Sequence, residues 1–466
     1  MFPVSIRTLG CKLNQVESEA LAGSFKDAGF ALAPSHGKIA GEGIVIVNTC
    51  TVTSKADQKA RALIRRALRE NPRACVIVTG CYAKLDPAEI EALWGGSASE
   101  GARRLFVPPG GEEGAGAAKS ALLKLGASVR EAVLLGESLP DAIESWMACQ
   151  EGRSEGARDP FAFRPGEFAF HSRGYLKIQD GCDSRCAYCR ARLARGPSAS
   201  LPPDAALARL RALEENGCAE VALAGVNITQ YRHSGFDLPR LLESLIEGTR
   251  TIALRLSSLE PEGIDERLVS ALAHPRIRPH FHITAQSGSD RVLRVMGRRY
   301  DARAVEKAAA LLRSTKENPF LACDIIAGFP SEAESDFALT LELCEKIRFA
   351  WIHAFPYSPR PGTLAFSFGD RVSEREARRR VGVLTDLATR GRREYAAAWL
   401  DRELSAVVEK REPQQGRCQA VSENYLRLAV NCAGGAPPPG SAIRCVPVTL
   451  CPDGNDSADA IADALP

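Results

Sequence analysis

The N-terminal third of the chain repeats one unit, and this repeat constrains the fold more than any other feature. In each copy, a run of apolar and mostly β-branched residues leads through a short polar or glycine segment to a cysteine, at 4–11, 43–50 and 75–81. Helical periodicity follows, most clearly over 54–70 and 87–93. Strands that are apolar on both faces and alternate with helices predict a parallel, doubly wound sheet.

In a doubly wound sheet, ligands bind beyond the carboxyl ends of the strands. Cys11, Cys50 and Cys81 all fall at that edge, so we expect their three thiols to meet at one point. The alternative is that they are ordinary buried cysteines at strand ends, but the repeated placement favours a shared site.

Strands and helices alternate again from about residue 175. Candidate strands lie at 175–179, 220–224, 252–257, 280–284, 322–327 and 351–355, with helices such as 203–216 and 332–347 between them. Six β/α units with no long hydrophilic break predict a parallel barrel or part of one, with functional residues on the loops after the strands.

The remaining segments suggest how the chain divides. The Gly-, Ala- and Glu-rich stretch from residue 95 predicts a surface insertion, and 151–166 a linker. After a helix at 373–400, short strands parted by Gly and Pro predict a small β-barrel, and the acidic end predicts a frayed tail. The expected parts are 1–150, 151–166, 167–396, 397–455 and 456–466.

Composition limits the class of protein. The 466 residues are 45% hydrophobic, enough to bury several cores, and 60 Lys and Arg against 57 Asp and Glu give a net charge of +3. The chain is therefore no polycation, and any nucleic-acid contact must depend on local basic patches. No apolar run reaches the length of a membrane span and no signal peptide is visible, so we expect a cytoplasmic protein without a membrane partner.

The strongest chemical signal is a second group of cysteines, Cys182-Asp-Ser-Arg-Cys186-Ala-Tyr-Cys189, after the first barrel strand. A reducing compartment disfavours disulfides, and thiolates are the ligands of iron-sulfur clusters, of which a cubane normally takes four. Three thiolates leave one iron open to a small molecule. The alternative, a structural zinc site, needs a fourth ligand nearby, and His171 lies upstream across a predicted strand.

This spacing, with the aromatic Tyr188 before the last cysteine and a β/α barrel around it, resembles the radical S-adenosylmethionine enzymes. Further segments resemble the methylthiotransferase family over nearly the whole chain, namely 8–15, 48–50, 80–81, 286–290, 328–330 and 355–363. The branch that acts on threonylcarbamoyladenosine in tRNA is the most similar, through Cys-Lys-Leu-Asn-Gln at 11–15 and Ala-Arg-Gly-Pro-Ser at 194–198.

The resemblance implies an α/β fold with an N-terminal doubly wound sheet, a central partial (βα)6 barrel and a small C-terminal RNA-binding β-barrel of the TRAM type. It implies two 4Fe-4S clusters that face one cavity. The cluster on Cys182, Cys186 and Cys189 would reduce S-adenosylmethionine to a 5′-deoxyadenosyl radical that activates C2 of the adenine. The cluster on Cys11, Cys50 and Cys81 would deliver the sulfur, which is methylated from a second S-adenosylmethionine.

The implied partners are the tRNA anticodon stem-loop and an electron donor such as flavodoxin or ferredoxin, and the chain is expected to be a monomer. Rival substrates are isopentenyladenosine in tRNA and an aspartate of a ribosomal protein. A rival of another class is a non-catalytic, RNA-binding iron-sulfur protein that senses redox state.

Supporting residues are predicted from their place in the chain. Cofactor contacts are expected at the barrel mouth from Tyr188, Gly225, Asn227, Arg255, Ser257, Glu260, Gln286 and Ser287. Each of these alone also fits an ordinary cap or turn. RNA contacts are expected from basic patches that include Arg65, Arg69, Arg195, Arg379 and Arg392, although such runs are often simply solvated helix faces.

Overall fold

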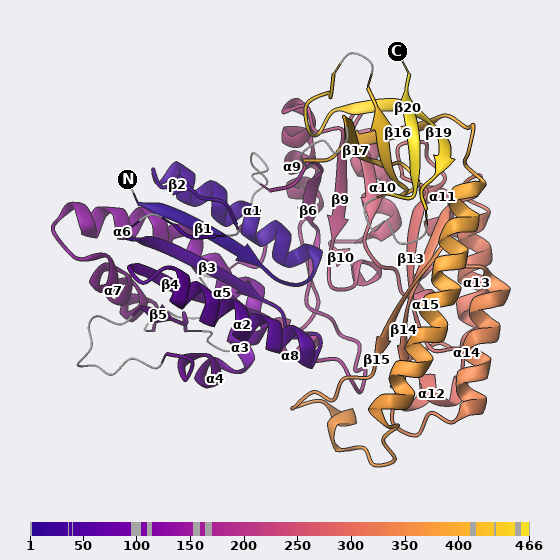
Figure 1. The fold of residues 1–466 in the computed structure, drawn as a ribbon, viewed down its shortest axis with the longest axis horizontal. Helices are drawn as coiled ribbons and strands as arrows, with labels where there is room; N and C mark the ends of the chain where they lie inside the picture. The colour runs from indigo at the N-terminus through magenta and orange to yellow at the C-terminus, as the bar shows by residue number, and fades with distance from the viewer. Residues whose placement is uncertain are drawn as a thin grey trace.

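The protein consists of an N-terminal sheet, a partial barrel and a small closed barrel (Figure 1). The computed structural model describes residues 2–35, 37–39, 41–94, 104–109, 114–151, 159–163, 170–410, 416–432, 435–452 and 458–465. Within these ranges, no helix is long and apolar enough to cross a membrane.

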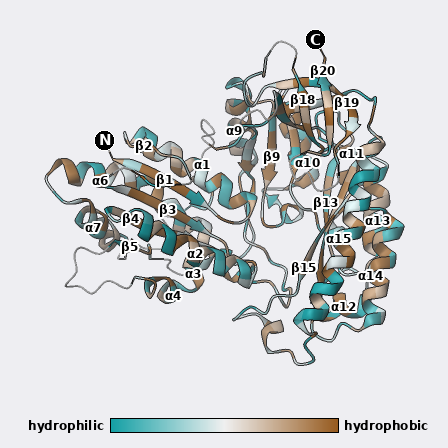
Figure 2. Ribbon diagram, in the orientation of Figure 1, coloured by the Kyte–Doolittle hydropathy of each residue, from teal (hydrophilic) through white to brown (hydrophobic). Residues whose placement is uncertain are grey.

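The N-terminal sheet is parallel and has the order β2-β1-β3-β4-β5. Its strands are β1 (Pro3–Thr8), β2 (Ala31–Leu32), β3 (Gly43–Thr49), β4 (Ala74–Gly80) and β5 (Leu105–Phe106). The helices between them are α1 (Lys12–Asp27), α2 (Ser54–Glu70), α3 (Cys81–Leu85) and α4 (Pro87–Glu91). Strand β3 is largely brown in Figure 2 and the covering helix α2 largely teal, as expected of a buried strand beneath an amphipathic helix. The predicted doubly wound sheet is confirmed.

The segment after this sheet differs from the prediction. Four helices, α5 (Ala115–Ser120), η1 (Ala121–Lys124), α6 (Leu125–Leu134) and α7 (Leu139–Glu151), follow where a surface insertion is expected. Leu122, Leu125, Val129 and Ile143 are fully buried against the sheet. The prediction is wrong for these residues, because apolar side chains at helical spacing outweigh the Gly- and Ala-rich composition. Residues 95–103 and 110–113, and most of the predicted linker, lie outside the described residues.

The central part is an open barrel of six parallel strands in two groups, β6-β9-β12 and β13-β14-β15. The strands are β6 (Gly174–Lys177), β9 (Glu220–Ala224), β12 (Ala253–Leu256), β13 (His280–Gln286), β14 (Phe320–Ala327) and β15 (Trp351–Pro356). Single bridges, Leu254 with Ile277 and Leu259 with Ile283, join the two groups. Among the described residues, β6 and β15 do not pair, so the barrel is open between them. The predicted partial barrel is confirmed.

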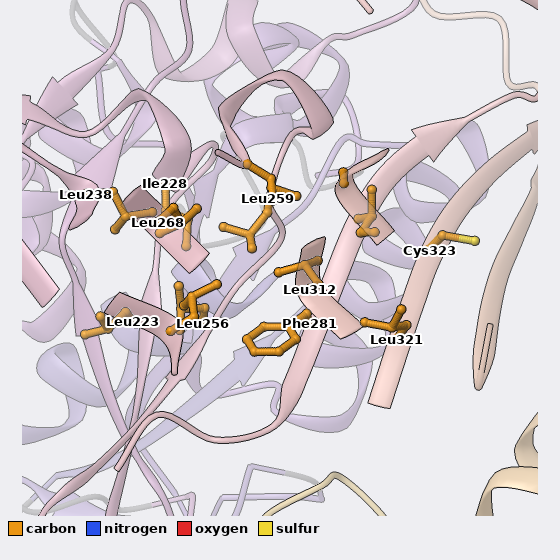
Figure 3. Close-up of a cluster of buried hydrophobic side chains, with 14 of the residues drawn as sticks. Leu223, Ile228, Leu238, Leu256, Leu259, Leu268, Phe281, Leu312, Leu321 and Cys323 are labelled. Atoms are coloured by element: carbon orange, nitrogen blue, oxygen red, sulfur yellow. The ribbon is translucent and has the colours of Figure 1, made fainter. Parts of the chain in front are cut away.

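Helices cover the outside of this barrel. They are α9 (Pro203–Glu215), α10 (Leu238–Glu247), α11 (Glu266–Leu272), α12 (Asp290–Val295), α13 (Ala302–Arg313), α14 (Glu334–Ile347) and α15 (Glu374–Ala397). Leu223, Leu256, Phe281 and Leu321 face these helices and pack with helix residues such as Leu312 (Figure 3). This layer is the main core of the molecule.

Side chains alternate across each strand, so the residues between these apolar ones face into the barrel. They are strongly polar and include Glu220, Arg255, His280, His282, Asp324 and His353. The inner face is therefore a polar surface, which suits a charged ligand better than an apolar one.

The C-terminal barrel is closed, in the order β16-β17-β18-β20-β19. Its strands are β16 (Leu404–Val408), β17 (Arg417–Ser422), β18 (Arg427–Asn431), β19 (Ala442–Leu450) and β20 (Ala460–Ala464). The predicted frayed tail is wrong for β20, which pairs parallel with β18 and antiparallel with β19. Ala460 and Ala462 are fully buried, because small side chains let this last strand close the barrel. The other predicted domain boundaries stay predictions.

Ion pairs attach this closed barrel to the amino ends of the central strands. Glu220, at the start of β9, accepts from Arg255 at 2.7 Å and from Arg278 at 2.9 Å. Arg255 also donates to the Ser422 carbonyl at 3.1 Å, and Arg278 lies 3.3 Å from Glu423. The prediction that Arg255 contacts a cofactor at the barrel mouth is therefore wrong, because its guanidinium turns back to the opposite end.

Arg392 on α15 also belongs to this junction. Its guanidinium lies 2.7 Å from Asp459 and above the rings of Phe320 and Trp351. A guanidinium used in this way holds the closed barrel against the open one. The prediction that Arg392 contacts RNA is therefore wrong.

The Glu220 junction gives a testable prediction. Burial alone raises the pKa of Glu220, but Arg255, Arg278 and Arg173 outweigh it and lower the pKa to about 2. The stabilisation is therefore complete above the pKa of about 4.3 that an unfolded Glu has, and is lost as the pH falls toward 2. Glu220→Gln leaves buried guanidinium groups unpaired and lowers the free energy of unfolding at neutral pH by about 3–5 kcal/mol.

Urea unfolding of this variant checks the prediction, with Glu243→Gln on the exposed face of α10 as the matched control. Equal stability of the two variants would contradict it.

Candidate functional site

Three cysteines follow three neighbouring strands of the N-terminal sheet, at its carboxyl edge. Cys11 follows β1 and is exposed, whereas Cys50 after β3 and Cys81 after β4 are each 7% exposed. Burial raises the pKa of the Cys50 thiol to about 12, and the thiols of Cys11 and Cys81 act in the same direction. The loops therefore bring the three sulfurs within electrostatic range of one another.

The glycine before the first of these cysteines permits this approach. Gly10 has φ +108°, and a Cβ there would lie 2.5 Å from the Cβ and 2.9 Å from the Sγ of Cys50. Any side chain would push the two loops apart.

Two asparagines fix the same loops. Asn14 on α1 donates to the carbonyls of Leu9 at 2.6 Å and Thr49 at 3.0 Å. Asn48 in turn donates to the Asn14 carbonyl at 3.0 Å. Asn14 of the 8–15 motif and Asn48 of the 48–50 motif therefore fix the positions of the loops and do not serve to bind a ligand.

The second trio lies in the irregular loop after β6 and β7 (Gln179–Asp180). Cys182 is 8% exposed and its sulfur accepts from the Ser184 amide at 3.4 Å, while Cys186 and Cys189 are half-buried. Burial raises the pKa of Cys186 to about 12, an effect that Arg298 opposes and the other two thiols increase. These three sulfurs also lie within electrostatic range of one another.

The donor set fits two iron-sulfur clusters. All six thiols are free, and each trio groups three of them at a loop cluster. Within the described ranges, no three His, Cys, Asp or Glu side chains are close enough to hold a single metal ion. A cubane takes thiolate ligands on its irons, so three cysteines on one loop cluster are a donor set that suits it.

The loops of the two trios are bonded to each other. Arg190, directly after Cys189, donates at 3.1 Å to Thr51, directly after Cys50. Arg190 also pairs with Asp86 at 2.8 Å, and Arg360 donates to the same Thr51 hydroxyl at 2.7 Å. Arg190 therefore fixes the Cys50 loop against the Cys189 loop, and Arg360 fixes it against the segment after β15.

A second buried junction links the Cys11 and Cys182 sides. Arg195 on α8 (Ala191–Arg195) lies 3.0 Å from both Glu17 on α1 and Asp180, and donates to Asn14 at 2.9 Å. Lys177 completes the junction at 2.9 Å from Glu17 and 2.6 Å from Asp180. The predicted RNA contact of Arg195 is wrong, because its pairing with Glu17 and Asp180 buries its side chain.

Several predicted cofactor residues lie at the barrel mouth. Asn227 and Ser257 are 4% and 8% exposed, and within the described residues Asn227 Nδ2 and Ser257 Oγ find no hydrogen-bond partner. Buried polar atoms are costly unless something bonds them, so these two atoms favour a polar ligand.

Glu260 and Tyr188 are joined through one arginine. Arg298 pairs with Glu260 at 2.7 Å and donates to the Tyr188 hydroxyl. Gly225 allows close packing, because a Cβ there would lie 2.8 Å from Gln179 Oε1. Gln286 ends β13 at φ +64°. The cofactor roles predicted for these residues stay predictions.

The structure places the Ser287 side chain away from the position predicted for it. Its side chain is fully buried, and its hydroxyl lies 3.3 Å from the Thr340 hydroxyl and accepts from the Ser289 amide at 3.2 Å. The hydroxyl therefore fixes the turn after β13 and faces α14, so the predicted cofactor contact of this side chain is wrong.

The remaining predicted RNA residues are accessible. Arg65 and Arg69 are exposed on α2. Arg379 is exposed on α15, but it already donates to Glu376 and Glu334 at 2.7 and 2.8 Å. RNA contact by these three stays a prediction.

The sequence reading missed Arg190, Arg360 and Thr51. A signal was available for two of them, since Arg360 lies inside the 355–363 motif and Thr51 follows a motif cysteine. Arg190 gives no such signal, because its acidic partners Asp86 and Asp57 are more than a hundred residues away in sequence.

Comparisons with known proteins agree with these two centres. Residues 3–97 match the model of "Uncharacterized protein family UPF0004", and residues 176–344 match the Radical SAM superfamily. The threonylcarbamoyladenosine tRNA methylthiotransferase MtaB of Treponema pallidum is 41% identical, over 95% of this chain and 98% of that protein. The same-named protein of Thermotoga maritima is 35% identical, over 83% and 82%. The tRNA-2-methylthio-N(6)-dimethylallyladenosine synthase of Solibacter usitatus is 30% identical, over 82% and 80%.

The Arg195 junction gives a prediction. Arg195→Met removes the guanidinium that bridges Glu17 and Asp180 in a buried site, so the free energy of unfolding falls by about 3–5 kcal/mol. Amide hydrogen exchange then speeds up in α1 and α8, which the junction joins, but not in α13. The matched control is Arg375→Met, on an exposed position of α15. Unchanged exchange in α1 would contradict the assignment.

Proposed function

The chain belongs to the threonylcarbamoyladenosine tRNA methylthiotransferase family, and we propose that it adds a methylthio group to C2 of N6-threonylcarbamoyladenosine next to the tRNA anticodon. The observation that supports this most is that two free cysteine trios sit on loops bonded to each other through Arg190 and Arg195. A redox sensor needs no second centre so close to the first. Identity of 41% and 35% to two enzymes named for threonylcarbamoyladenosine, against 30% to one named for dimethylallyladenosine, favours the first substrate.

The chemistry comes from two 4Fe-4S clusters and S-adenosylmethionine, which together supply the 5′-deoxyadenosyl radical, the sulfur and the methyl group. The residues of this chain hold and position these groups. Cys182, Cys186 and Cys189 would hold one cluster, and Cys11, Cys50 and Cys81 the other.

Other side chains would orient S-adenosylmethionine and the base. Asn227 Nδ2 and Ser257 Oγ are free to bond a polar ligand at the barrel mouth. Arg298 fixes the side chains of Glu260 and Tyr188. Cys182 and Cys81 are themselves buried, which keeps these two thiols largely out of water.

The proposed RNA partner is the tRNA anticodon stem-loop. Arg65 and Arg69 on α2 would contact phosphates, and the target base would leave the loop stack to enter the site. We further propose an electron donor such as flavodoxin or ferredoxin, a monomeric enzyme and a cytoplasmic location.

Nucleoside mass spectrometry tests the substrate. A strain that lacks the gene should accumulate N6-threonylcarbamoyladenosine and lose its 2-methylthio derivative, and the wild-type gene should restore it. A gene copy with Cys182→Ala is the matched control and should not. Unchanged hypermodified adenosines in the deletion strain would refute the proposed substrate.

Iron analysis tests the two clusters. The anaerobically reconstituted protein should hold about eight irons per chain, and a variant with Cys11, Cys50 and Cys81 changed to Ala about four. That variant should still form 5′-deoxyadenosine from S-adenosylmethionine but no methylthio product, because the radical arises at the other trio. A wild-type protein that forms no 5′-deoxyadenosine would support the sensor reading instead.

A further inference from the structure

One cation inside the open barrel has no partner. The inner face and its base hold Arg173, Arg255 and Arg278, and each is paired with a carboxylate. Lys12 also lies there, and within the described part of the chain its ammonium forms no hydrogen bond or ion pair. Four cations thus face three carboxylates, Glu220, Glu409 and Glu423, all of which the arginines already occupy.

Lys12 reaches this place from the N-terminal sheet. It is the first residue of α1, and its neighbours Leu13 and Val16 pack on Ala224 at the end of β9. Helix α1 contacts β6, one edge of the open barrel (Figure 1). The charge of Lys12 acts on Tyr425, on His280 of β13 and on His353 of β15, at the other edge. The Lys12 ammonium therefore lies within electrostatic range of both groups of barrel strands.

A further acid on the inner wall, Asp324, does not pair with Lys12. Asp324 on β14 is already engaged, with its carboxylate 3.0 Å from His282 Nε2. The ring of His282 stacks on that of His353 with centroids 5.1 Å apart, and His353 stacks in turn on Phe355 at 6.4 Å. Phe355 is 42% exposed, so this row of rings ends in an open aromatic face. Such a face suits a planar base or carbamoyl group.

We propose that Lys12 binds the carboxylate of the threonyl group on the substrate adenosine and thereby selects adenosines with an acidic N6 substituent. This inference rests on the proposed function. A carboxylate that leaves water for a protein site needs a charged partner, and Lys12 is a half-buried cation that no protein carboxylate has claimed. An uncharged isopentenyl group would leave the ammonium unpaired, so one residue both attracts the right substrate and rejects the wrong one.

The test compares two synthetic anticodon stem-loops that differ in one group. One contains N6-threonylcarbamoyladenosine, and the other contains its threoninamide analogue, which has the same shape without the charge. Wild-type enzyme should prefer the acid by about 10- to 150-fold in kcat/KM, the factor expected for hydrogen bonds to a charged group. Lys12→Met should remove this preference and Lys12→Arg should retain most of it. Lys307→Met, on the exposed face of α13, is the matched control.

Two further measurements separate specificity from damage to the neighbouring Cys11 centre. Iron content shows whether the clusters are intact, and fluorescence anisotropy gives the affinity for both RNAs without turnover. The same loss of preference in binding is expected for Lys12→Met. A preference that survives in Lys12→Met, or an equal fall for both RNAs, overturns the assignment of Lys12 alone. A wild-type enzyme that modifies only isopentenyladenosine RNA overturns the proposed function as well.

Discussion

The buried guanidinium of Arg195 is the constraint on which the arrangement of the two centres depends. Glu17 belongs to the helix after Cys11, and Asp180 lies two residues before Cys182, so one side chain fixes both loops. Charges removed from water are tolerated only when they are paired and bonded, and Lys119 and Lys177 complete the pairing. This junction therefore holds the N-terminal sheet against the open barrel beside both cysteine loops.

The Arg195 junction carries an excess of positive charge, which can offset the negative charge of a neighbouring cluster. Glu17 and Asp180 face Arg195, Lys119 and Lys177, so the junction has one more cation than it has acids. Burial lowers the pKa of Arg195, but the two acids and the thiols of Cys81 and Cys11 raise it well above its ordinary value. A cluster held by three thiolates is itself anionic, and a fixed cation beside it offsets that charge.

Sequence reasoning could place the cysteines because strand periodicity locates the carboxyl edge of a parallel sheet without any tertiary information. It failed for Arg255 and Ser287, which sit near strand ends but whose side chains bond Glu220 and Thr340. It failed for Arg195 and Arg392 because an arginine with a distant acidic partner looks in sequence like an arginine for phosphate. Strand β20 was missed because its alanines show no β-branched pattern.

The central claim is that the two cysteine trios hold two clusters at one site, and magnetic coupling tests it most directly. Both clusters of the anaerobically reconstituted protein are reduced to their paramagnetic state, and the EPR spectrum is compared with those of two variants that each lack one trio. The account predicts a spectrum broadened or split by spin–spin interaction that is absent from both variants. A wild-type spectrum equal to the sum of the two variant spectra would mean that the clusters are far apart, and would contradict the account.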